Sequence, residues 1–127
     1  MRTPFTGCGT ALVTPFDSSG AVDEAAVGRL ARRQIEAGIH FLVPCGTTGE
    51  TPTLSDAEYK AVVTRVTAIA RPLDLVVIPG AGSNSTAHAL ELHRFVAGVG
   101  ADASLDIAHL DHGGGEDQVV DDRTEQE

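Results

Sequence analysis

The sequence predicts an α/β fold in which short buried strands alternate with amphipathic helices. Three apolar runs of strand length, at 9–16, 41–45 and 75–79, are each bounded by Gly, Pro or Asp. The intervals between them have helical periodicity, and this spacing is typical of βαβ units. Because the runs are apolar throughout rather than alternating, we expect a parallel sheet covered on both faces.

The three intervening helices are predicted from their boundary residues. The first is expected over 23–38 with Asp23 as its N-cap, and the second begins with the S-x-x-E capping box of 55–58 and stops before Pro72. The third is expected over about 86–97, ended by glycines. The residues expected to face inward are Val27, Leu30, Ala31, Ile35, Val62, Val66, Ile69, Ala70, Leu92 and Val96.

The charge of the chain is unevenly distributed. Of the net charge of −9, residues 1–100 carry nine acids and eight bases, whereas residues 101–127 carry nine acids and one base. We therefore divide the chain into a folded part, 1–105, and an acidic, disordered tail, 106–127. The alternating segment 101–107 is a candidate fourth strand, but its pattern is that of a half-exposed strand rather than of one covered on both faces. The absence of a basic stripe argues against nucleic acid as a partner. The first apolar run is neither a signal peptide nor a membrane span, so we expect a cytoplasmic protein without membrane contact.

The cysteines and histidines predict neither a metal site nor a cofactor. Cys8 and Cys45 form no C-x-x-C pair and are expected to be small core residues in a reducing compartment. His109 and His112 lie among acids in the glycine-rich tail, where a preformed metal site is not expected. The remaining histidines, interpreted as surface or helix-flank residues, are His40, His88 and His93.

Two glycine-rich loops, GTTGET at 46–51 and GAGSNS at 80–85, follow the second and third predicted strands. Ligands of parallel α/β folds bind at these strand ends. Neither loop matches a P-loop or a dinucleotide fingerprint. The hydroxyls and backbone N–H groups of Thr47 and Thr48, turned by Gly46 and Gly49, match the two oxygens of a carboxylate. The alternative that the threonines only cap the following turn stays open.

Three motifs in this order, TALVTPF at 10–16, CGTTGE at 45–50 and GAGSN at 80–84, resemble the N-terminal part of the dihydrodipicolinate synthase family, within the superfamily of N-acetylneuraminate lyase. The resemblance covers roughly residues 5–105 and implies a (β/α)₈ TIM barrel, of which this chain would hold three βα units and the candidate fourth strand. It also implies a homotetrameric, cytoplasmic lyase that condenses pyruvate, through a Schiff base, with aspartate semialdehyde in lysine biosynthesis.

The same resemblance assigns roles to individual residues. Gly46, Thr47 and Thr48 would hold the carboxylate of pyruvate or a related 2-keto acid, and Thr47 would also join two tyrosines in a catalytic proton relay. Asn84 matches the family's lysine-effector site at a dimer interface. The residues that depart from the pattern of lysine-inhibited members are Thr51, Pro52, Asp56 and His88.

The family's Schiff-base lysine and relay tyrosines have no counterpart in this sequence. Its one lysine, Lys60, and one tyrosine, Tyr59, both lie in the second predicted helix, on the outside of such a barrel. We therefore expect a truncated or frame-shifted chain that is inactive alone. Two alternatives stay open: another pyruvate-dependent aldolase or lyase completed by a second chain, and a non-catalytic module that binds anions or serves as an interaction surface. With unpaired strand edges, the chain should self-associate or need a complementary fragment.

Overall fold

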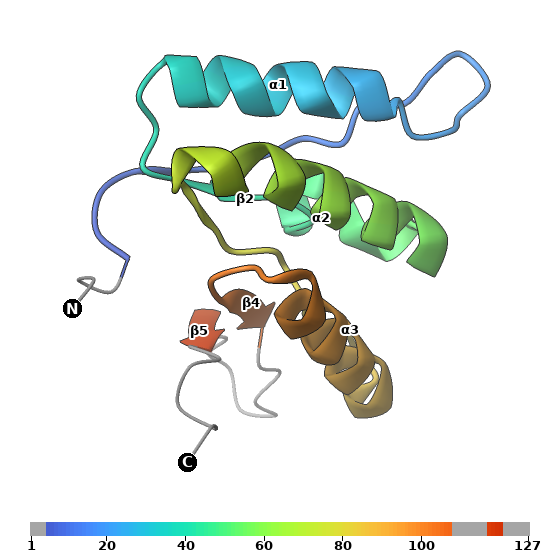
Figure 1. Cartoon of the computed structure of the whole chain (residues 1–127). Helices are drawn as coiled ribbons and strands as arrows, with labels where there is room; N and C mark the ends of the chain where they lie inside the picture. Colours follow the sequence, from blue (N-terminus) through green and yellow to red (C-terminus); the bar gives the residue numbers. More distant parts are fainter. Residues whose placement is uncertain (1–4, 108–116, 121–127) are drawn as a thin grey trace.

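The computed structural model describes residues 5–107 and 117–120 of the chain, and it confirms the alternation of strands and helices (Figure 1). Three parallel strands form a sheet in the order β1-β2-β3, with Gly9 opposite Phe41 and Phe41 opposite Val76. The elements of this part are β1 (Gly9–Ala11), α1 (Glu24–Glu36), β2 (Phe41–Val43), α2 (Asp56–Ala70), η3 (Arg71–Leu73), β3 (Val76–Val77) and α3 (Thr86–Val99).

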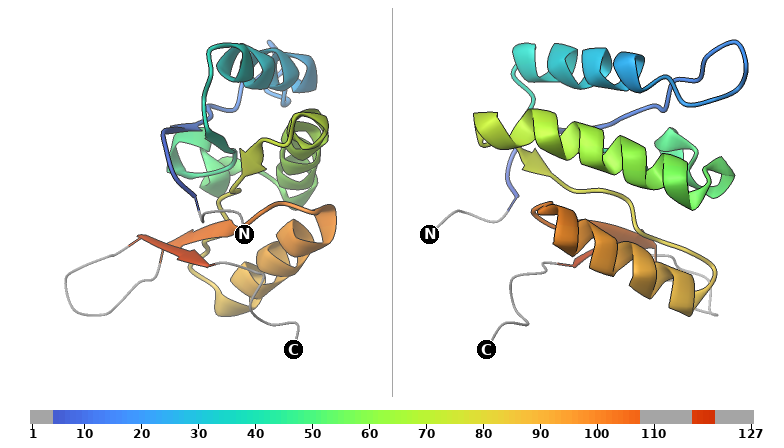
Figure 2. Two further views of the ribbon diagram at one scale, coloured as in Figure 1. Left: turned by 60° about the vertical axis from the view of Figure 1, so that its left-hand side comes forward. Right: turned by 45° about the vertical axis from the view of Figure 1, so that its right-hand side comes forward.

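The three long helices lie side by side on one side of the strands, α1 against α2 and α2 against α3 (Figure 2). The expected cover on both faces is therefore wrong for the residues that the structure describes. The reason is topological, because successive right-handed crossovers between sequential neighbouring strands bring every helix to the same face. Leu42 and Val77 point into the buried layer, whereas Phe41, Val43 and Val76 are only half-buried.

The helix boundaries follow the predicted capping residues. Asp23 accepts a hydrogen bond from the backbone N–H of Ala26 at 2.8 Å, at the start of α1. Ser55 and Glu58 form the capping box of α2, in which the Ser55 N–H donates to the Glu58 carboxylate at 2.8 Å. Helix α3 runs to Val99, past the expected end, because Gly98 stays helical and the left-handed residue that ends the helix is Gly100, with φ of 82°.

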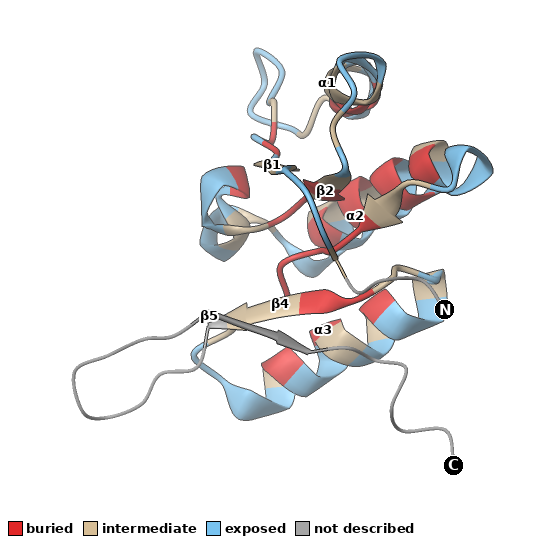
Figure 3. Cartoon of the chain, turned by 90° about the vertical axis from the view of Figure 1, so that its left-hand side faces the viewer, coloured by how far each residue is buried: buried red, intermediate tan, exposed pale blue. Residues whose placement is uncertain are grey.

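The core lies between the helices and the strands, where Figure 3 shows buried residues on the inner helix faces. Most of the expected inward residues are buried, while Leu30, Ile35 and Ile69 are partly buried. Cys45 is buried as expected, but Cys8 is exposed, which corrects its assignment to the core. The buried residues of the cluster are Leu12, Val27, Ala31, Leu42, Cys45, Tyr59, Val62, Val63, Val66, Ala70, Val77, Ala81, Leu92 and Val96.

The candidate fourth strand is present as β4 (Ser104–Ile107). It lies parallel to the chain that follows β3, since the Leu105 N–H donates to the Pro79 carbonyl at 2.9 Å and the Ala81 N–H to the Leu105 carbonyl at 2.8 Å. A further strand, β5 (Asp117–Val120), pairs antiparallel with β4.

These two strands extend into 106–127, the range for which an acidic tail is predicted. Asp106 and Ile107 belong to β4, and 117–120 form a strand where a disordered tail was expected. The rest of that tail, including His109 and His112, lies outside the described residues. Within the described part, no helix is long and apolar enough to cross a membrane.

Candidate functional site

The GTTGET loop leaves β2 at its carboxyl end and forms two short 3₁₀ turns, η1 (Thr47–Gly49) and η2 (Thr51–Thr53). The Gly49 N–H donates to the Gly46 carbonyl and the Glu50 N–H to the Thr47 carbonyl, both at 3.0 Å. The left-handed positions are Cys45, with φ of 55°, and Glu50, with φ of 58°. Gly46 has an extended backbone that any residue adopts, so the expected hinge at Gly46 is displaced to its neighbour Cys45.

Gly49 is the glycine that the loop does need. A β-carbon there would lie 3.1 Å from the Leu12 carbonyl oxygen and 3.3 Å from the Thr14 hydroxyl oxygen. The buried Thr14 hydroxyl donates to the Gly49 carbonyl at 2.7 Å, which fastens the loop to the end of the first apolar run. On the other side, the Thr51 hydroxyl contacts the carbonyl oxygens of Cys45 and Gly46. The loop is thus held in place by its own backbone hydrogen bonds and by the hydroxyls of Thr14 and Thr51.

Thr47 and Thr48 have exposed positions on this anchored loop. Within the described residues, neither hydroxyl and neither backbone N–H of the pair has a hydrogen-bond partner. The first turn of any helix leaves such N–H groups without internal acceptors. Four donors are therefore available at the carboxyl end of β2, where the sequence predicts a ligand site.

The GAGSNS loop after β3 meets the GTTGET loop at Gly80. The Gly80 N–H donates to the Pro44 carbonyl at 2.9 Å, and the Gly80 carbonyl accepts from the hydroxyl of Tyr59 at 2.7 Å. Burial raises the pKa of Tyr59 above its ordinary value of 10.0, and the neighbouring Cys45 raises it further. Burial also raises the pKa of the Cys45 thiol to about 12, so both groups stay protonated at neutral pH.

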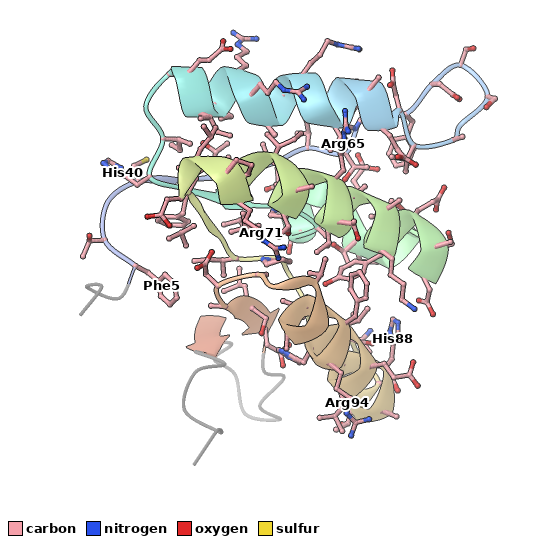
Figure 4. The ribbon with its side chains drawn as sticks, viewed as in Figure 1. Phe5, His40, Arg65, Arg71, His88 and Arg94 are labelled. Carbon is pink, nitrogen blue, oxygen red and sulfur yellow. The ribbon has the colours of Figure 1, made fainter. Side chains whose placement is uncertain are left out.

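Asn84 is exposed in the same loop, just before α3, and has no contact with the two threonines in the described hydrogen bonds. Two of the residues that depart from the lysine-effector pattern do contact each other. His88 Nε2 lies 3.1 Å from Asp56 Oδ1, and His88 Nδ1 lies 3.0 Å from Ser83 Oγ. Figure 4 shows His88 on the side of α3 that faces α2. The pair thus joins the first turns of the two helices.

The contact between His93 and two residues of β4 is not predicted by the sequence. His93 Nδ1 lies 2.7 Å from Ser104 Oγ and His93 Nε2 lies 3.4 Å from Asp106 Oδ2. The three residue types are those of a hydrolytic triad, but Ser104 is fully buried and cannot meet a substrate. The contact joins α3 to β4 and gives Asp106 a partner. The alternation of Ser104 and Asp106 along the strand was the signal for their shared face.

Metal binding finds no support among residues 5–107 and 117–120. No group of three or more His, Cys, Asp or Glu side chains is gathered there in a way that could hold a metal ion. The histidines of the described part have their own partners in Cys8, Ser83 or Ser104, as His40 Nδ1 accepts from the Cys8 N–H at 2.8 Å.

Sequential parallel strands with the long helices on one side form an α/β fold with a small parallel sheet, the arrangement of strands and helices that recurs in (β/α) barrels. Residues 4–109 match the family described as the dihydrodipicolinate synthetase family, and the chain belongs to that family.

Curated relatives and solved structures agree with this membership. The chain is 55% identical over 103 residues to 4-hydroxy-tetrahydrodipicolinate synthase of Parvibaculum lavamentivorans. The aligned residues make up 81% of this chain and 35% of the relative. The solved synthase of Methylacidiphilum fumariolicum is 36% identical with a TM-score of 0.78, covering 87% of this chain and 36% of that one. The synthase of Aquifex aeolicus is 38% identical with a TM-score of 0.76, covering 80% and 34%. The chain spans about a third of the length of these relatives.

Proposed function

We propose that Gly46, Thr47 and Thr48 bind the carboxylate of pyruvate or a related 2-keto acid, as part of a dihydrodipicolinate synthase-like lyase. The observation that supports this proposal most is the presence of four hydrogen-bond donors without partners, two hydroxyls and two N–H groups, on an exposed turn at the end of β2. A carboxylate accepts hydrogen bonds at both oxygens and needs no cation when several donors converge on it.

The chemistry of such a lyase depends on where this carboxylate is held. An imine between the keto group and a lysine acts as an electron sink, so that the methyl group loses a proton and the resulting enamine attacks the aldehyde partner. Holding the carboxylate fixes the keto carbon relative to the amine. A hydroxyl next to the bound acid, for which we propose Thr47, can pass protons during these steps.

Lys60 is not placed to supply the amine. Its side chain is exposed on α2, and its Nζ lies 5.6 Å from the centre of the Phe95 ring of α3, on the helical side of the molecule. The loop that carries Thr47 leaves the carboxyl end of β2 instead. We propose that the amine and the relay tyrosines come from outside these 127 residues and that the residues alone are catalytically inactive.

A titration and a trapping experiment test the proposal together. We expect pyruvate to shift the amide resonances of residues 46–49, and the double substitution Thr47→Val with Thr48→Val to abolish the shift. Thr64→Val, at an exposed threonine on α2, is the matched control and should bind pyruvate like the unaltered chain. Incubation with pyruvate and borohydride should leave the mass of the chain unchanged.

Each alternative has its own outcome. An adduct on Lys60 in the chain alone would contradict the proposed inactivity. An adduct that forms only after a second fragment is added would identify the completing chain. Carboxylate binding with no adduct under any condition would favour a non-catalytic anion-binding module. Absence of pyruvate binding in the unaltered chain would overturn the proposed site.

A further inference from the structure

We propose that Tyr59 is a positioning residue of the carboxylate loop, acting through Gly80 and Cys45. The proposal rests on the proposed function, because it concerns the same loop, and it assigns a role to a residue outside the loop itself. Tyr59 belongs to α2, on the helical side of the strands. Among the described residues, its hydroxyl bonds to Gly80 and makes no hydrogen bond to the exposed turn.

The first step is the attachment of Tyr59 to the end of β3. The side chain is 2% exposed, and its hydroxyl lies 2.7 Å from the Gly80 carbonyl oxygen. The ring packs edge-to-face on Phe95, with the ring centres 6.2 Å apart and the planes at 63°. Ring packing fixes the direction of the phenol, so the hydroxyl holds the Gly80 carbonyl in one orientation.

The second step is the contact from Gly80 to the loop. A β-carbon on Gly80 would lie 2.3 Å from the Cys45 carbonyl oxygen and 2.8 Å from the Gly46 Cα, so the two backbones touch with no side chain between them. The Gly80 N–H is bonded to the Pro44 carbonyl as well. A displacement of Gly80 must therefore displace Cys45 and Gly46.

The third step is the turn itself. Cys45 has the left-handed φ of 55°, and this conformation directs the chain from β2 into η1, which carries Thr47 and Thr48. A left-handed backbone is disfavoured for a side-chain-bearing residue and persists where the surroundings hold it. Tyr59, through Gly80, is one of the contacts that hold it. The raised pKa of the phenol keeps it a hydrogen-bond donor throughout the neutral range.

The substitution Tyr59→Phe tests the role, because it keeps the ring and removes the hydroxyl. Thr10→Val is the matched control, since the Thr10 hydroxyl also joins a strand to a helix, at 2.9 Å from Gln34 Oε1, without reaching the loop. We expect Tyr59→Phe to move the amide resonances of residues 45–49 in the ligand-free protein and to weaken pyruvate binding about tenfold, the size of one well-formed hydrogen bond. Thr10→Val should leave both unchanged.

The outcomes separate this proposal from the proposed function. If the unaltered chain does not bind pyruvate, the proposed function fails, and the ligand-free resonances of residues 45–49 still decide whether Tyr59 positions the loop. Unchanged resonances and unchanged affinity in Tyr59→Phe would overturn the positioning role.

A second measurement applies if Tyr59→Phe does not fold. Because Tyr59 is the one tyrosine of the sequence, biosynthetic 3-fluorotyrosine labels this site alone. Its fluorine resonance should move on addition of pyruvate, and this movement should vanish in the double variant Thr47→Val with Thr48→Val. A resonance that does not respond to bound pyruvate would overturn the proposal.

Discussion

The backbone of Gly80 is in direct contact with the backbone of Cys45. A β-carbon on Gly80 would not fit beside the Cys45 carbonyl oxygen. An ideal β-carbon on Gly80 would approach that oxygen to 2.3 Å. The ends of β3 and β2 are thereby joined at the point where both glycine-rich loops begin. The neighbouring turn is exposed, whereas Pro44, Cys45 and Gly80 at its base are buried.

The first prediction concerns this contact. Gly80→Ala should lower the free energy of unfolding by about 3 kcal/mol, because the methyl group overlaps backbone that cannot move freely. Gly98→Ala is the control, since Gly98 lies in α3 with no atom within 4 Å of its β-carbon position. That change should raise stability by about 0.5–1 kcal/mol. Urea denaturation measures both, and equal stability of the two variants would contradict the contact.

A second prediction concerns the ionisation of Tyr59. The sequence contains one tyrosine and no tryptophan, so tyrosinate absorbance reports this residue alone. Burial raises its pKa above 10.0, and the folded protein should therefore show no tyrosinate absorbance as the pH passes that value. Absorbance should appear together with the loss of circular dichroism. An ionisation at pH 10 in folded protein would contradict the burial of the phenol.

The same shifts determine how stability depends on pH. Cys45 and Tyr59 bind their protons more tightly in the folded state, so their contribution to stability is complete below their unfolded pKa values of 9.0 and 10.0, respectively. It is lost progressively as the pH rises above these values toward the folded ones. The free energy of unfolding should therefore fall from about pH 9 upward. In Tyr59→Phe, the part of this decline that begins at pH 10 should be absent.

A third prediction distinguishes the two cysteines. Cys8 is exposed, whereas Cys45 is buried and has a pKa raised to about 12. Iodoacetamide at mildly alkaline pH should therefore modify Cys8 in the folded protein and leave Cys45 intact, because the thiolate is the reactive form. Peptide mass spectrometry identifies the modified residue. In denaturant both cysteines should react, and modification of Cys45 without denaturant would show that the base of the loop opens.

A fourth prediction concerns the start of α2, directly after the loop. Ser55→Ala removes the hydroxyl that accepts from the Glu58 N–H and should lower the free energy of unfolding by about 1 kcal/mol. Ser55→Thr keeps a capping hydroxyl and should cost less than half of that. Thermal unfolding of both variants makes the comparison. Equal losses in both would assign the effect to packing rather than to capping.

Local chemistry explains why much of the fold was predictable. Asp23 and the pair Ser55 and Glu58 cap their helices through contacts within four residues in the chain, and such contacts are visible in the sequence. The single helical layer was not predicted, because uniformly apolar strands do not reveal which face the crossovers cover. β5 was missed because the acidic composition of the surrounding range, 101–127, is typical of a solvated segment, although β4 offers β5 backbone partners.

The candidate site was predictable in position but not in its internal support. The motif placed Thr47 and Thr48 at a strand end, where the structure has them exposed. The left-handed Cys45, the hydroxyl of Thr14 under Gly49 and the phenol of Tyr59 on Gly80 depend on approaches between residues 21 to 35 apart in the chain. No spacing rule within one loop can reveal such approaches.

The pairing of β5 with β4 limits how this sheet can grow. The antiparallel ladder occupies main-chain groups along the outer side of β4, from Ser104 opposite Val120 to Ile107 opposite Asp117. A strand of another molecule could pair with this side of β4 only after β5 had dissociated from it. On the opposite flank, β1 has β2 as its one strand neighbour in the described part of the chain, so no ladder comparable to that of β4 and β5 is formed there by the described residues.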